Sequence, residues 1–442
     1  MPVASACVRP LPARARRAAL VLLAALAGAA LAALAACGPA PDRRAGAGAA
    51  WTLDTAAVRG PAAPRTDSAR VNLYVDATVS MGGYVADPNS RYAEFLEGLE
   101  SAAQTTWRRA DVHFFRFGAE AQEVGRPAFL AAKAPAFYTE KLTDIDRAVD
   151  CGPPNEVRVI VTDLFQSEGD VNAIVARIKD RCFQRGRAVA VLGVPSQFRG
   201  KVYDAKVPAY VYASTANPAS YRPFYALLLG DVGSLEPMLA SLSARAGGAR
   251  LPYVTIAPTV VRHYGVVMRK APGTREFNPQ TPISPYEFGF VLLKNQRGGT
   301  VLADVALTPA PGAPPLRADQ LELVAYRRAV SGGAKARADS TETPDVTLQR
   351  STQNGDSLHL TLAVNPPGTP GTYAYKLVLR TPATGGFSDP AWVTQYSSTN
   401  PTPTADANKT LNLAEFVRDM RLAASSVTQP RVAVWYLTVR KL

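Results

Sequence analysis

The chain has 442 residues and a formal net charge of +13 at pH 7, with 47% hydrophobic and 19% charged residues. This length favours two or three domains over one, and the composition excludes a disordered or fibrous protein. Four cysteines and three scattered histidines exclude a zinc cluster built from paired cysteines and disfavour a histidine-rich metal site. The common sequence signatures of metalloproteases, serine hydrolases, P-loop enzymes and dinucleotide-binding proteins do not occur.

The amino terminus has the pattern of an export signal. Arginines between positions 9 and 17 precede an apolar Ala/Leu run over residues 18–36, and positions 34–38 read Leu-Ala-Ala-Cys-Gly. A basic segment, an apolar segment and small residues before a cleavage point define a secretory signal, and a cysteine at the cut resembles bacterial lipoproteins. The alternative is a transmembrane helix, because a run of about 19 residues is near the length that crosses a bilayer.

The lipoprotein resemblance implies that residues 1–36 are removed and that Cys37 becomes the lipidated first residue. Two or more acyl chains, such as palmitate, would anchor the protein stably to a membrane without a spanning helix. Gly38 favours the periplasmic face of the outer membrane if the host is Gram-negative. Residues 37–70 are rich in Ala, Pro, Gly and Arg, which predicts a flexible linker.

A predicted strand over residues 71–75 runs directly into Asp76, Thr78 and Ser80, which alternate along one loop. Three oxygen side chains at alternate positions can converge on a hard cation, which prefers about six oxygen ligands. This D-x-T-x-S pattern resembles the metal-ion-dependent adhesion site of von Willebrand factor A (VWA) domains, whose pattern is D-x-S-x-S. The alternative is that the three side chains only cap backbone groups of the loop, which would account for this loop alone.

Two further segments resemble the same family. Thr143 precedes a predicted helix, as does the threonine of the family's second loop, and an apolar strand over residues 157–162 ends at Asp163, where the family has Thr-Asp-Gly. Leu164 stands in place of that glycine and is a departure from the pattern. A phosphatase of the haloacid dehalogenase type would need a second carboxylate where Thr78 stands.

The resemblance implies a ligand set and a partner. Thr78, Ser80 and Thr143 would contact Mg2+, or Mn2+ or Ca2+, directly, while Asp76 and Asp163 would act largely through water. The remaining coordination position would accept an Asp or Glu carboxylate from an envelope protein.

The predicted fold follows from the resemblance and from the pattern of short elements. Residues 71–248 are expected to form a VWA-like α/β domain with a doubly wound, mostly parallel sheet, of the Rossmann-like kind that binds ligands at the carboxyl ends of its strands. Residues 195–220 show no helical pattern and instead predict a hairpin or insertion. Residues 249–442 show short strands between Pro and Gly turns, which predicts an all-β, sandwich-like region with one helix over 411–424.

Cys151 and Cys182 both fall at the end of the predicted domain that is opposite the metal loops. In an exported protein this favours a disulfide, although two separate buried thiols are the alternative.

The positive charge is concentrated in the second half of the chain. Residues 71–248 have 19 basic and 20 acidic side chains, whereas residues 249–442 have 21 and 13, a net charge of +8. This basic half could attract an anionic envelope polymer or could simply be a solvated surface. Nucleic acid is not expected as a partner, because the basic residues are not interleaved with aromatic residues and the protein is exported.

These observations predict a lipid-anchored protein of the cell envelope that binds a partner's acidic group through a metal ion and is not an enzyme. Two alternatives stay open. One is a metal-dependent envelope enzyme, for which Asp144 and Asp146 lie close to the metal residues in sequence. The other is a structural envelope lipoprotein that binds no ion.

Overall fold

The computed structural model describes residues 67–442 with internal gaps. The gaps are residues 165–170, 205–206, 246–250, 259–260, 283, 310–311, 314–315, 330–340, 383–387, 400–405 and 428–430. The predicted signal peptide, the lipidation site Cys37 and almost all of the predicted linker therefore lie outside the described residues. In the part of the chain that is described, no helix is both long enough and apolar enough to cross a membrane.

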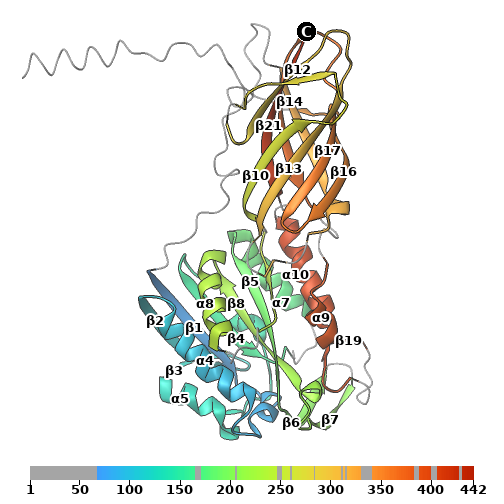
Figure 1. Ribbon diagram of the computed structural model, residues 1–442. Coiled ribbons are helices and arrows are strands. Elements are labelled where there is room, and N and C mark those ends of the chain that lie inside the picture. The colour runs from blue at the N-terminus through green and yellow to red at the C-terminus, as the bar shows by residue number, and fades with distance from the viewer. Residues whose placement is uncertain are drawn as a thin grey trace, which may run out of the picture.

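The first layer of the fold is a seven-stranded sheet with the order β3-β2-β1-β4-β8-β5-β9 (Figure 1). Its strands are β1 (Ser68–Asp76), β2 (Arg109–Phe117), β3 (Ala121–Val124), β4 (Glu156–Thr162), β5 (Ala188–Ser196), β8 (Arg222–Gly230) and β9 (Tyr253–Ile256). Among the described pairs of this sheet, β1–β2 and β1–β4 are parallel, and the other four are antiparallel. The prediction of a doubly wound, mostly parallel VWA sheet is therefore wrong.

The reason for the difference is the connection between β5 and β8. A parallel return would need a crossover, usually a helix, that brings the chain back to the same edge of the sheet. Here the chain instead forms a hairpin of β6 (Arg199–Asp204) and β7 (Val207–Ala213), followed by a short 3-10 turn. It then returns antiparallel as β8, which inserts between β4 and β5.

Helices cover both faces of this sheet and bury one apolar core on each side. One face packs against α4 (Arg91–Thr105), α5 (Arg126–Leu130) and α8 (Val232–Arg245). The other face packs against α6 (Ile145–Ala148), α7 (Val171–Arg181), α9 (Ala391–Tyr396) and α10 (Leu413–Val427). The helix that the sequence pattern placed at 411–424 is α10, and it lies beside α7 on the first sheet (Figure 1).

The late helices are fastened to the first sheet by packing and by hydrogen bonds. Trp392 of α9 covers Gly193 of β5 so closely that a Cβ built there would lie 2.7 Å from the indole ring. The Tyr225 hydroxyl donates to Thr410 Oγ1 at 2.8 Å. Helices α9 and α10 therefore complete the core of the amino-terminal half, although they lie beyond position 390.

The rest of the second half forms two facing sheets that share one apolar core. One sheet contains β10 (Val261–Lys270), β13 (Gly299–Pro309), β17 (Ser357–Val364) and β16 (Val346–Asn354), in that order. The other contains β11 (Phe277–Pro279), β12 (Glu287–Leu292), β21 (Arg431–Lys441), β18 (Gly371–Arg380), β14 (Glu322–Ala329) and β15 (Thr341–Glu342). A small pair, β19 (Ser397–Ser398) with β20 (Thr410–Leu411), joins α9 to α10.

Candidate metal centre

The candidate site lies where β1 and β4 end side by side. These two strands are parallel neighbours, with Val75 opposite Val161, so their carboxyl ends meet at one edge of the sheet. Asp76 is the last residue of β1, and Asp163 directly follows β4. Asp76 and Asp163 therefore lie at the same edge of the sheet, although the sheet as a whole is not parallel.

Hydrogen bonds hold the first loop in a compact turn. Both the backbone N–H and the hydroxyl of Thr78 donate to Asp76 Oδ1, at 3.0 and 2.6 Å. The hydroxyls of Thr78 and Ser80 lie 3.0 Å apart. All three side chains are buried. Alternation along the loop thus brings three oxygen groups together, as the sequence pattern predicted.

The second loop is paired with the first. The Val79 N–H donates to the Glu140 carbonyl at 2.9 Å, and the Asp144 N–H donates to the Gly118 carbonyl at 3.0 Å. Thr143 lies between these two anchored positions and is buried. A Cβ at Gly118 would lie 2.7 Å from Glu140 Cβ, so this close approach of the loop to the end of β2 requires glycine.

The end of β4 adds a residue that was not predicted from the sequence, Thr162. The Thr162 hydroxyl donates to Asp76 Oδ2 at 2.8 Å and accepts from the Leu164 N–H at 3.2 Å. Leu164 has φ +62°, which is the left-handed conformation that glycine adopts readily. Leu164, which stands where the family pattern has glycine, therefore adopts a left-handed backbone conformation. This conformation costs about 1 kcal/mol in a residue other than glycine. A hydroxyl residue directly before Asp163 was the available signal for Thr162.

Without a cation, it is unfavourable for Asp76 and Asp163 to be ionised together at this site. Burial and, second, the charge of Asp163 raise the pKa of Asp76 to about 7, against the opposing effect of hydrogen bonds from Thr78 and Thr162. A divalent cation would relieve both the burial penalty and the repulsion. The donor groups are carboxylates and hydroxyls, which fit Mg2+, Mn2+ or Ca2+ and do not suit softer metals.

Over the described ranges, no group of three or more acidic, histidine or cysteine residues is placed to hold a metal ion. The candidate centre contains two of these residues, Asp76 and Asp163, and its remaining oxygens are hydroxyls.

Comparison with known proteins finds no relative: no family model, no curated protein and no solved structure matches this chain.

The acids that the enzyme alternative depends on lie beside the second loop. Asp144 precedes α6 and forms an ion pair with Arg147 at 3.0 Å. Asp146 lies within α6, and a hydrogen bond with Asp144, followed by partial burial, raises its pKa. The two acids thus interact with each other and with a neighbouring arginine.

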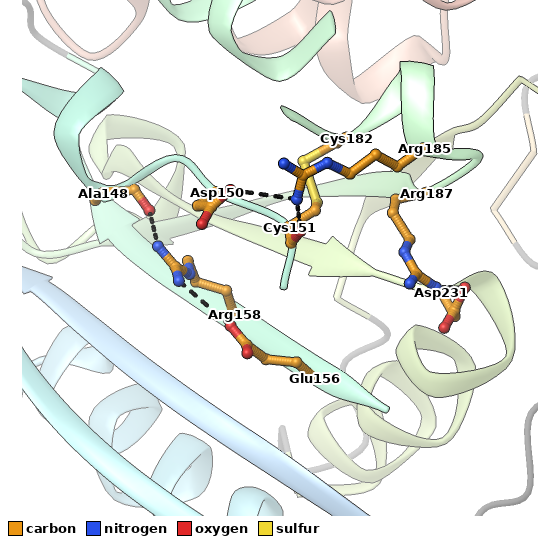
Figure 2. Close-up of a disulfide and its surroundings, with 9 residues drawn as sticks. All are labelled: Ala148, Asp150, Cys151, Glu156, Arg158, Cys182, Arg185, Arg187 and Asp231. Carbon is orange, nitrogen blue, oxygen red and sulfur yellow. Dashed lines mark hydrogen bonds and ion pairs between the residues drawn. A yellow bond between two sulfur atoms is a disulfide. The ribbon is translucent and has the colours of Figure 1, made fainter. Parts of the chain in front are cut away.

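The disulfide expected between Cys151 and Cys182 is present, and both residues are buried (Figure 2). It joins the segment before β4 to the end of α7. The Arg185 guanidinium donates to the Cys151 carbonyl at 2.7 Å and lies 3.8 Å from Asp150. The disulfide is therefore near the start of β4, at the opposite end of that strand from the candidate site.

Proposed function

We propose that this protein is an extracytoplasmic binding protein that uses a divalent cation to bind a carboxylate of a partner protein. The residues that would hold Mg2+, or Mn2+ or Ca2+, are Asp76, Thr78, Ser80, Thr143 and Asp163. The observation that carries the proposal is the buried pair Asp76 and Asp163, set among hydroxyl groups, in which the pKa of Asp76 is raised to about 7.

The donor set favours binding of an external anion. Two carboxylates match the formal charge of a divalent ion, and the three hydroxyl groups add neutral oxygen ligands. These five groups leave one position open on a hard cation that prefers about six oxygen ligands, and a further carboxylate could fill it. Capture of an acidic side chain is therefore the chemistry that this set supports best.

The position of the site suits a tethered protein. The chain enters β1 at Ser68, and Asp76 is at the other end of the strand. At about 3.3 Å per residue these two positions are roughly 25 Å apart. If Cys37 is lipidated, the site lies away from the end at which the tether enters. The disulfide supports an oxidising compartment such as the periplasm.

The test is cation-dependent stability of the purified chain. We expect Mg2+ or Mn2+ to stabilise the protein relative to EDTA, by about 3 kcal/mol at a hundredfold excess over the dissociation constant. Thr78→Ser keeps the hydroxyl and should keep this shift, whereas Thr78→Val keeps the shape, loses the hydroxyl and should lose the shift. An equal cation effect in all three proteins, or none in the unmodified protein, would remove the proposed centre.

A further inference from the structure

Exposed apolar side chains concentrate at the edge of the sheet that carries the candidate site. Six large hydrophobic residues are exposed in the described part of the chain. Three of them belong to this edge: Val79 at 41%, Leu142 at 57% and Val211 at 76% exposure. Single exposed apolar residues need no explanation, but a group of them around one site indicates a contact surface.

Two of these residues flank the hydroxyl groups directly. Val79 lies between Thr78 and Ser80, and because those two side chains are buried, the alternation of the loop leaves Val79 outside. Leu142 directly precedes Thr143 on the second loop. The two loops are joined by backbone hydrogen bonds, so Val79 and Leu142 belong to one surface.

The third residue lies on a hairpin that is fixed beside the first loop. β6 and β7 leave the sheet at the end of β5, which points the same way as β1 and β4 because both β4 and β5 are antiparallel to β8. A Cβ at Gly200 of β6 would lie 3.0 Å from the Cα of Gly83, in the 3-10 helix Met81–Val85 that follows Ser80. The β6–β7 hairpin, which carries Val211, therefore lies at the same edge of the sheet (Figure 1).

We propose that the carboxylate bound at this site belongs to a protein segment with aliphatic residues on both sides of its Asp or Glu. This inference rests on the proposed function. The ion would take the carboxylate, while Val79 and Leu142 would contact the aliphatic neighbours, with Val211 as an outer contact. Burial of apolar surface stabilises such a complex, and a hydroxyl-rich sugar acid would not obtain this gain.

The experiment uses two dye-labelled peptides that differ only beside a central glutamate, with leucine on both sides in one and serine in the other. Binding is measured by fluorescence anisotropy in Mg2+ and in EDTA. We expect the leucine peptide to bind about tenfold more tightly than the serine peptide, in Mg2+ alone. Leu142→Ser should reduce that preference several-fold and leave the thermal shift with Mg2+ unchanged. Val267→Ser, at an exposed valine of β10, is the matched control and should change neither.

The outcomes separate this inference from the proposed function. If Mg2+ stabilises the protein but the two peptides bind equally, or neither binds, the aliphatic partner is overturned and the metal centre stands. Stronger binding of a glucuronate oligosaccharide than of the leucine peptide would also overturn it. If Mg2+ has no effect on stability, the proposed function itself is wrong.

Discussion

Replacing the buried acid of the candidate centre should change how stability depends on pH. In the metal-free protein the raised pKa of Asp76 means that the folded state resists ionisation of this group. An acid whose pKa is higher in the folded state than in the unfolded state contributes stability that is fully present below the pKa of the unfolded state. That stability is lost as the pH rises through the pKa of the folded state. Without cation, the protein should therefore lose stability between about pH 4 and pH 7.

The size of this loss follows from the shift. The pKa of Asp76 is raised from 3.8 to about 7. At about 1.4 kcal/mol per pKa unit this corresponds to a loss of up to roughly 4 kcal/mol in the free energy of unfolding. Asp76→Asn cannot ionise and should avoid the loss. If the asparagine oxygen accepts from Thr78, as Asp76 Oδ1 does, the amide nitrogen takes the place of Asp76 Oδ2 and cannot accept from the Thr162 hydroxyl; this loss costs about 1 kcal/mol at every pH and leaves the slope unchanged.

The measurement is urea unfolding of both proteins at pH 5 and pH 8 in EDTA. We expect the unmodified protein to lose about 2 to 4 kcal/mol more than Asp76→Asn between these two pH values. Saturating Mg2+ should abolish that difference, because the ion offsets the buried charge. Asp87→Asn, at an exposed acid a short way along the chain, serves as the control. Parallel pH profiles of the unmodified protein and Asp76→Asn in EDTA would refute the reasoning.

Three further results are expected. The double variant of Cys151→Ala with Cys182→Ala should lower the free energy of unfolding by about 3 kcal/mol, because the cross-link restricts the unfolded chain. Urea titration measures this difference, and a change in the free energy of unfolding near zero would contradict a stabilising disulfide. Gly193→Ala should destabilise the protein by about 1 to 3 kcal/mol through overlap with Trp392, and Trp392→Ala in the same chain should relieve part of that cost if α9 is docked as described. Hydrogen bonds to two carboxylates raise the pKa of His113, so its contribution to stability should be present in acid and lost as the pH rises through that pKa. If the difference in the free energy of unfolding between His113→Gln and the unmodified protein does not change from pH 5 to pH 8, that result would argue against these contacts.

The parts of the site that the sequence predicted are those governed by short-range order. Asp76, Thr78 and Ser80 alternate in one loop, and that spacing alone brings their oxygens together. Thr162 stands directly before Asp163 in the sequence, but its role was not predicted because that role depends on a strand that is distant in the chain. Only the parallel pairing of β1 with β4 brings its hydroxyl to Asp76.

The fold class was mispredicted because strand direction depends on distant parts of the chain. The absence of a helical pattern over residues 195–220 was visible in the sequence and already argued against a parallel return. The pattern could not show that β8 inserts between β4 and β5, because that position depends on pairing with residues that lie 26 to 71 positions earlier in the chain. The late helix α10 was likewise predicted as a helix, and packing alone assigns it to the first sheet.

The sequence by itself thus determined which polar groups end the strands, where the basic charge lies and which cysteines can meet, because these depend on local order and composition. The tertiary structure decided the direction of the strands, the burial that raises the pKa of Asp76, and the placement of Val79, Leu142 and Val211 on one edge. Those properties arise from contacts between segments far apart in the chain, and the low polarity of a buried site exists only once these segments have come together.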